Sequence, residues 1–185
     1  MTTVTFLPLE LRSLDKLRAD LLVLSVFEDE RPLRGLSGLI DWRTAGMLSR
    51  FLVRGHVTGQ EGEIVLFPPG GKVGVSRGLI LGLGNASAYD EKRYARVVAD
   101  AADHISRLRL KSLALSLPGT HKRPLDIEKA ADTFAEIAAG SLTQLTLFAS
   151  QSERREITGA LKRRRGDFEV AGGGGAPTQL QGGSP

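Results

Sequence analysis

Residues 79–90 read LILGLGNASAYD, an apolar run that leads through Gly82 and Gly84 into a stretch with helical periodicity. Strand, glycine turn and helix follow one another in this order where α/β sheets bind dinucleotides. Such a site also needs an acidic residue about 20 positions on, at the end of the next strand, and the next apolar run ends in SLPG. We therefore interpret the two glycines as a tight strand exit. Ser87 is expected to cap the helix, with Asp90 in the capping-box position.

Outward from this stretch, apolar runs alternate with segments that carry a helical stripe. The runs read as strands lie at 4–7, 19–27, 64–67, 79–82, 112–119 and 144–150, with FEV (168–170) as an edge strand. The helical segments lie at 36–52, 87–108, 125–140 and 152–166. Continuous apolar strands indicate burial on both faces. The glycine turn between 63–67 and 79–82 predicts an antiparallel pair. We therefore expect a three-layer α/β/α fold with a mixed, mostly parallel sheet.

Composition limits the remaining possibilities. The chain has 185 residues, 41% of them hydrophobic and 25% charged, with a net charge of +4 and no cysteine. We expect one domain over residues 1–170 and a disordered glycine-rich tail over 171–185. The absence of cysteine excludes disulfides and thiolate zinc sites. The sequence shows neither a signal-peptide pattern nor an apolar run of about 18 residues, so we expect a cytoplasmic protein with no membrane contact.

Several quoted segments together resemble a known family. ADLLVLSVFEDE, GQEGEIVLFPP, RGLILGLGNASAYDEKRYARVVADAA and KSLALSLPG occur in the order and spacing of the N-terminal domain of the leucyl aminopeptidases, the cytosol aminopeptidase family of two-zinc peptidases. The resemblance covers roughly residues 4–165. It implies a macro-domain-like fold, because that N-terminal domain is related to the macro domain, which binds ADP-ribose. The strand, loop, helix and strand over residues 112–150 also resemble macro domains directly.

The sequence also differs from that family, and the differences determine which function we expect. In leucyl aminopeptidases a separate domain carries the zinc-binding lysine, aspartates and glutamate and an Asn-Thr-Asp-Ala-Glu-Gly-Arg motif, none of which occurs here. The resemblance thus implies a non-catalytic accessory, regulatory or protein-interaction module, with a protein partner or self-association and no cofactor. Two alternatives stay open: a macro-domain-like binder of ADP-ribose or another nucleotide or phosphate ligand, and one subunit of a split aminopeptidase.

The best candidate ligand loop is PGTHKRP, residues 118–124. It follows a strand and precedes a helix, the position where open α/β sheets bind ligands and where helix N-termini attract anions. The candidate ligand-binding residues in it and in the first loop are Gly119, Thr120, His121, Lys122 and Arg123, with Gly82, Gly84, Asn85 and Ser87. The competing interpretation is a solvated basic connection. By position, Asp20 could resemble the acid that macro domains place near adenine.

Three other features favour a structural interpretation. The glycine-rich turn 70–78 could add backbone amides to the same site, but turn chemistry already accounts for its glycines. The basic run Lys162–Arg165 suits a helix C-terminus and has no interleaved aromatic residues, so we expect no nucleic-acid partner. His56, His104 and His121 lack the spacing of metal ligands, so we expect no metal site.

Overall fold

The computed structural model describes residues 1–121, 125–138, 142–164 and 166–171. Strands and helices alternate along them in the following order: β1 (Thr2–Leu7), α1 (Leu11–Lys16), β2 (Ala19–Val26), α2 (Gly35–Arg43), α3 (Met47–Val53), β3 (Ile64–Phe67), β4 (Val75–Gly82), the 3-10 turn η1 (Ala86–Ala88), α4 (Glu91–Ser106), β5 (Ser112–Leu115), α5 (Ile127–Ala138), β6 (Gln144–Phe148), α6 (Gln151–Arg163) and β7 (Phe168–Val170). Gly140, the expected end of α5, and the expected tail from residue 172 onward lie outside the described residues. Within the described ranges, no helix is long and apolar enough to cross a membrane.

The strands form one seven-stranded sheet in the order β3-β4-β2-β5-β6-β1-β7. Every neighbouring pair is parallel except β3 and β4, which pair antiparallel with Ile64 opposite Leu81. This confirms the expected mixed, mostly parallel sheet, the antiparallel pair and the edge strand at 168–170. The order of the strands was not predicted, because it depends on long-range pairing such as that between β1 and β6.

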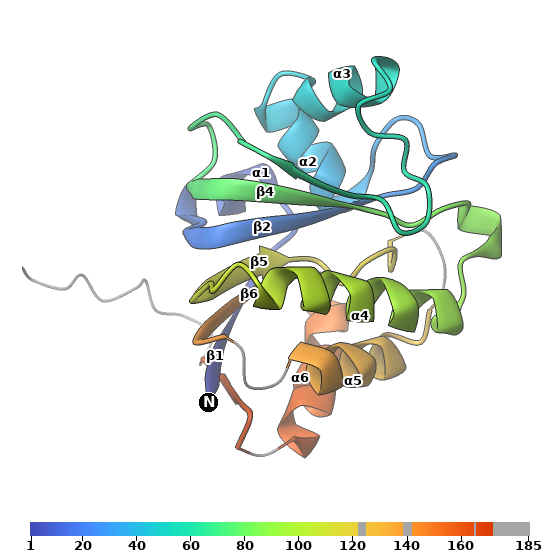
Figure 1. Cartoon of the computed structure of the whole chain (residues 1–185). Coiled ribbons are helices and arrows are strands. Elements are labelled where there is room, and N and C mark those ends of the chain that lie inside the picture. The colour runs from blue at the N-terminus through green and yellow to red at the C-terminus, as the bar shows by residue number, and fades with distance from the viewer. Residues whose placement is uncertain (122–124, 139–141, 165, 172–185) are drawn as a thin grey trace, which may run out of the picture.

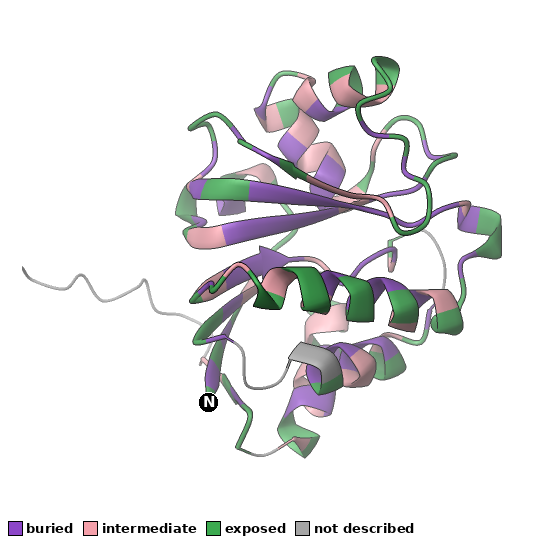
Figure 2. Cartoon of the chain, in the orientation of Figure 1, coloured by how far each residue is buried: buried purple, intermediate pink, exposed green. Residues whose placement is uncertain are grey.

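Helices cover both faces of the sheet, α1, α2 and α3 on one and α4, α5 and α6 on the other (Figure 1). The central strand β2 supplies both cores: Leu21 and Val23 pack in the cluster with α4, α5 and α6, whereas Leu22 and Leu24 pack in the cluster with α1, α2 and α3. The inner strands are accordingly buried along most of their length in Figure 2. Burial on both faces explains why these strands read as continuous apolar runs.

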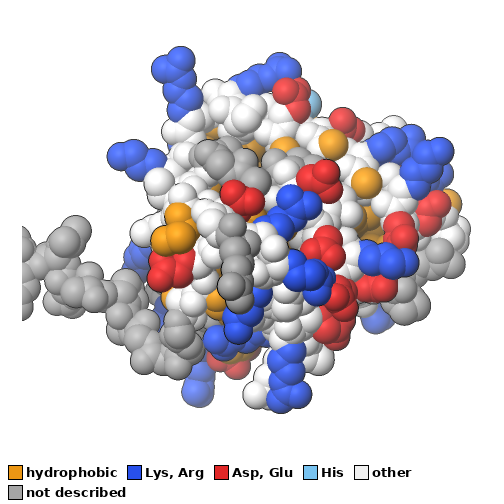
Figure 3. Space-filling view, turned by 90° about the horizontal axis from the view of Figure 1, so that it is seen from below, with side chains coloured by type: hydrophobic (Ala, Val, Ile, Leu, Met, Phe, Trp, Pro, Cys, Tyr) orange, Lys and Arg blue, Asp and Glu red, His pale blue; other side chains and the backbone are white. Residues whose placement is uncertain are grey.

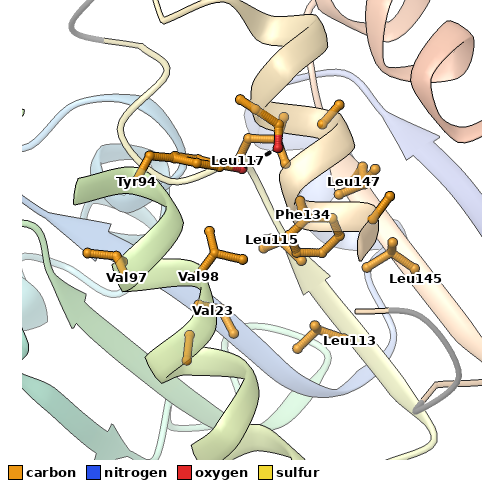
Figure 4. Packing of buried hydrophobic residues seen from close by; sticks show 14 of the residues in the cluster. Val23, Tyr94, Val97, Val98, Leu113, Leu115, Leu117, Phe134, Leu145 and Leu147 are labelled. Carbon is orange, nitrogen blue, oxygen red and sulfur yellow. Dashed lines mark hydrogen bonds between the residues drawn. The ribbon is translucent and has the colours of Figure 1, made fainter. Parts of the chain in front are cut away.

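The core beneath α4 and α5 is tightly connected (Figure 4). Phe134 of α5 and Val98 of α4 lie over Leu113 and Leu115 of β5. Tyr94 is 2% exposed, and its hydroxyl donates a hydrogen bond of 2.9 Å to the carbonyl oxygen of Ala130 in α5. A buried tyrosine usually finds such a partner, and this bond holds α4 against α5.

The single helix expected over 36–52 is in fact two, α2 and α3. Ala45 and Gly46 between them adopt left-handed conformations, with φ of 56° and 78°. The carboxylate of Asp41 accepts hydrogen bonds from the backbone N–H and the hydroxyl of Ser49, which fixes the turn. The apolar spacing continued through the break, because both helices lie on the same face of the sheet. Gly55 ends α3 as expected, with φ of 73°.

The expected Ser87 cap is also wrong, because α4 begins one turn later. Asp90 is the N-cap, and its carboxylate accepts a hydrogen bond of 2.8 Å from the backbone N–H of Arg93. Ser87 lies in η1, where Asn85 Oδ1 accepts from both its backbone N–H and its hydroxyl. Because that hydroxyl donates to Asn85, a helix amide gains no acceptor there. The short 3-10 turn also directs Tyr89 into the core, where it is 0% exposed.

Candidate functional site

Both predicted loops lie at the same edge of the sheet. β4, β2 and β5 are adjacent and parallel, so the segments that follow their carboxyl ends meet there. These segments are residues 82–87, 27–31 and 118–121. Lys122 and Arg123, the remaining candidates, lie outside the described residues. We call this region the carboxyl edge.

The exit of β4 is closely packed against its neighbours. A Cβ on Gly82 would collide with the carbonyl oxygen of Gln60, so a larger side chain does not fit. Gly84 has φ of 73°; its N–H donates to Gly59 O at 2.8 Å, and its carbonyl oxygen accepts from Glu28 N at 3.1 Å. The glycines therefore do form the tight exit predicted from the sequence. The N–H of Gly84, which a phosphate would need, is already bonded.

The amides of Ala86 and Ser87 also have partners within the chain. The N–H of Ala86 donates to Oδ1 of Asp29 at 3.0 Å, and the N–H of Ser87 donates to Oδ1 of Asn85 at 2.9 Å. A carboxylate oxygen thus takes one of the positions in which a bound anion would be stabilised by backbone amides. Asn85 and Ser87 lie together as predicted, but they bond to each other.

Aromatic rings fill the space between the two loops. Phe27 and Tyr89 are both 0% exposed and pack edge to face, with ring centroids 5.1 Å apart. The Tyr89 hydroxyl donates to the carbonyl oxygen of Pro118 at 3.2 Å. Gly119, with φ of 73°, lies against both rings, since a Cβ on it would come within 2.5 Å of Cε1 of Tyr89 and 3.1 Å of Cζ of Phe27. Gly119 is therefore needed for close approach, but the group that approaches its backbone is a side chain of this protein.

A carboxylate and an imidazole connect the loop after β5 to the segment after β2. His121 Nε2 lies 2.9 Å from Oε2 of Glu30; the Glu30 side chain is 3% exposed and that of His121 is 21% exposed. The imidazole also packs on Gly35, where an added Cβ would lie 3.3 Å from the ring, and on Phe27. His121 thus joins two loops through its side chain, although the residue as a whole is exposed.

Among the described residues, few polar groups at the carboxyl edge are available to react with or bind a ligand. Burial, and secondarily the charge of Glu61, raises the pKa of Tyr89 far above its ordinary value, so its hydroxyl stays protonated and acts as a hydrogen-bond donor. The hydroxyl of Thr120 donates to Leu117 O at 3.0 Å. Predicted site residues thus mostly bond to nearby groups of the chain. This arrangement supports a rigid surface better than a reacting centre.

Sequence reasoning missed Phe27, Tyr89 and Glu30. The sequence places Phe27 at the end of the strand expected over 19–27 and Tyr89 within the helix expected over 87–108, and it predicts no role for Glu30. One signal could have pointed to them: a large aromatic residue directly after the central strand lies where a ligand-binding α/β sheet would leave space.

Two features assigned to the same site lie at the opposite edge of the sheet. Asp20 is at the start of β2, where its carboxylate accepts hydrogen bonds from the N–H groups of Lys111 and Ser112. These bonds lower the pKa of Asp20. Residues 75–78 of the turn expected over 70–78 form the amino end of β4, where Val75 pairs with Ala19. The suggested likeness of Asp20 to an adenine-binding acid and the suggested amide contribution of the turn are therefore both wrong.

Two arginines of the basic run at the end of α6 pair with acidic side chains of α5, and Arg165 lies outside the described residues. Arg163 pairs with Glu128 and Asp132 of α5 at 2.6 and 2.9 Å, and Arg164 lies 3.4 Å from Glu136. On the face seen in Figure 3, Lys and Arg side chains are interspersed with Asp and Glu. This is a mixed surface, unlike the one-sign patch that binds nucleic acid.

A hollow of about 260 Å³ lies between α4 and α5, lined by Glu91, Tyr94, Leu125, Asp126, Lys129, Ala130, Asp132 and Thr133. Lys129 reaches across it to Glu91 at 3.4 Å. In the ranges that the structure describes, no three histidine or acidic side chains are grouped to hold a metal ion.

Comparison with known sequences gives a family. The profile described as "Cytosol aminopeptidase family, N-terminal domain" matches residues 23–151. A protein named "Probable cytosol aminopeptidase" from Paraburkholderia xenovorans is 30% identical over 153 residues, which are 83% of this chain and 29% of that protein. The chain thus spans less than a third of the length of this curated relative.

Comparison with solved structures shows the fold. A mutant of tomato leucine aminopeptidase matches 87% of this chain and 36% of its own, with a TM-score of 0.56 and 18% identity. A Trypanosoma brucei macrodomain, solved in complex with ADP, matches 86% of this chain and 69% of its own, with a TM-score of 0.67 and 12% identity. The expected macro-domain-like fold is therefore confirmed.

Proposed function

This chain belongs to the cytosol aminopeptidase family, of which it carries the N-terminal domain, and from that premise we propose that it works as a non-catalytic accessory module acting through protein contacts. The single observation that carries the proposal is the filled carboxyl edge. Phe27 and Tyr89 take the space between the loops, and Gly84, Ala86 and Ser87 have their amides bonded within the chain. We also propose a cytosolic location, in keeping with the name of the relatives.

The filled carboxyl edge favours a protein partner on the outer surface over a bound small ligand, because opening the edge costs free energy. A nucleotide would have to displace two buried rings and replace the hydrogen bond from Tyr89 to Pro118. Removing a buried aromatic side chain from a core costs about 3–5 kcal/mol. A ligand would need to recover that free energy before any net affinity appeared. A protein partner on the outer surface needs no such rearrangement.

Two measurements on the purified chain test this proposal. Calorimetry with ADP-ribose, ADP and inorganic phosphate at millimolar concentration should give no binding heat, with the T. brucei macrodomain and ADP as positive control. Affinity capture from the source cells, together with sedimentation of the chain alone, should recover a stoichiometric partner or a self-associated form. Binding heat from ADP-ribose, or a strictly monomeric chain with no partner, would overturn the proposal.

One observation favours the alternative of a nucleotide or phosphate ligand. The neighbouring macrodomains include one solved with ADP, and the loops 82–87 and 118–121 occupy the ligand-binding edge common to such sheets. Under this alternative, Tyr89 would move out when the ligand binds. Saturable heat from ADP-ribose, accompanied by a change in tyrosine fluorescence, would favour it.

The relatives' activity suggests a second alternative, a subunit of a split aminopeptidase. The matched part is 29% of the curated relative, so the remainder of such an enzyme would be supplied by a separate catalytic polypeptide. The chain alone should then hydrolyse no leucine anilide. Activity that appears only on mixing with a co-purified catalytic chain would favour this alternative.

A further inference from the structure

The edge strand β3 presents unpaired backbone groups to the outside of the sheet. Gly82 N–H donates to Glu63 O at 2.8 Å, and Val65 and Phe67 stand opposite Ile80 and Gly78 in the same ladder. Because antiparallel ladders alternate, Ile64 and Leu66 direct their N–H and C=O groups away from β4. Outside that ladder, neither residue has a backbone hydrogen bond in the described part of the chain.

Within its four residues, β3 carries neither a charge nor a proline, although Glu63 precedes it and Pro68 follows it. Exposed edge strands commonly carry a charge or proline, as the opposite edge does: Glu169 lies exposed in the middle of β7. In contrast, β3 reads IVLF with no charged residue, and Leu66 is 53% exposed. An uncharged edge with an exposed leucine favours the addition of another strand.

We propose that β3 pairs antiparallel with β3 of a second copy of this chain, about a two-fold axis at Val65, to form one continuous sheet across a dimer. This rests on the proposed function, since it names self-association as the protein contact. In this register Ile64 of one copy exchanges two hydrogen bonds with Leu66 of the other, and the symmetric pair does the same. All four outward N–H and C=O groups of each copy's Ile64 and Leu66 are then satisfied.

Neighbouring registers leave some of these backbone groups without a partner. This favours a second copy of the chain paired about the axis at Val65. An axis at Leu66 would place Ile64 opposite Pro68, which has no N–H. An axis at Ile64 would place Leu66 opposite Gly62, whose φ of 83° is not that of a strand. The sequence of β3 is thus self-complementary in one register.

The side chains agree with that register. Leu66 would pack beside Ile64 of the second copy on the face of α4, and the two Val65 side chains would meet on the face of α3. Four hydrogen bonds and a few apolar side chains form a small interface. The surface area that it buries is well below the roughly 1,200 Å² buried in stable complexes. The dimer is therefore weak, with a dissociation constant on the order of 10⁻⁴ M.

Sedimentation of the 185-residue chain between about 10 μM and 1 mM, a range set around that dissociation constant, tests the pairing. The wild-type chain should shift from monomer to dimer. Leu66→Lys and Leu66→Pro should raise the dissociation constant at least ~10-fold, since one places a charge on the edge and the other removes an outward N–H. Both leave the ladder to β4 intact, so their far-UV circular dichroism should match wild type. Trp42→Lys, at a 70% exposed residue of α2, should not change dimerisation.

Cross-linking tests the axis itself, because the chain has no cysteine of its own. Facing residues of a non-hydrogen-bonded antiparallel pair have Cα atoms about 4.5 Å apart, within reach of a disulfide. Val65→Cys should form a disulfide-linked dimer under mild oxidation much faster than the exposed control Trp42→Cys. Equal rates, or a wild-type chain that stays monomeric to about 1 mM, overturn the pairing. A monomeric chain that still captures another protein overturns this inference and leaves the proposed function standing.

Discussion

Substitution of Gly119 by alanine probes the aromatic filling of the carboxyl edge directly. The new Cβ would lie 2.5 Å from Cε1 of Tyr89 and 3.1 Å from Cζ of Phe27, and φ is 73°. The left-handed backbone costs about 1 kcal/mol for alanine, and overpacking costs about 1–3 kcal/mol more. We expect Gly119→Ala to lower the free energy of unfolding by about 2–4 kcal/mol, measured by urea denaturation with far-UV circular dichroism.

Two comparisons separate the backbone cost from the packing cost. Gly70 has nearly the same φ, 76°, with no atom within 4 Å of an added Cβ, so Gly70→Ala should cost only about 1 kcal/mol. In a Tyr89→Leu background, Gly119→Ala should cost about 1–2 kcal/mol less than in wild type, because the ring it strikes is gone. Equal costs at the two glycines, or additive effects of the Gly119 and Tyr89 changes, would refute the packing of the loop against Tyr89.

Three further substitutions test other contacts by the same unfolding measurement. Hydrogen bonds lower the pKa of Asp20 in the folded state, so its contribution is fully present above the ordinary aspartate pKa and is lost as pH falls through the lowered folded-state pKa. Asp20→Asn should therefore cost about 1 kcal/mol at pH 7 and progressively less as the solution is acidified. His121→Ala should cost about 1–3 kcal/mol because it removes a partner of the buried Glu30 carboxylate, and a cost below about 0.5 kcal/mol would contradict that pairing. Tyr94→Phe should cost about 1–2 kcal/mol because Ala130 O loses its buried donor, and an unchanged midpoint would contradict this.

The helix boundaries show where local pattern stops being informative. Apolar spacing found the helical face over 36–52, but not the break at Ala45 and Gly46, because both helices pack on the same side of the sheet. Ser87 and Asp90 are both good N-cap residues. Only the hydrogen bonds of Asn85 to Ser87 decide that the helix begins after Asp90.

The candidate site was predictable in position but not in content. Loops that follow parallel strands lie at the same edge of a sheet whatever their sequence, so residues 82–87 and 118–121 were expected at one edge. Their meeting across β2 depends on the strand order, which the sequence did not predict. Whether that edge holds a ligand or side chains depends on Phe27 and Tyr89, which reach it from different segments. Their contact is set by the packing of β2 against the start of α4, which no local pattern records.

By itself, the sequence determined the α/β layers, the antiparallel pair at β3 and β4, and the family, because burial on both faces and the order of motifs are recorded along the chain. The tertiary structure alone decided the strand order, the filling of the carboxyl edge and the unpaired edge of β3. The physical reason is range. Periodicity and capping act within a few residues, whereas the rings of Phe27 and Tyr89 meet Gly119 from 92 and 30 positions away along the chain, and only after the sheet has assembled.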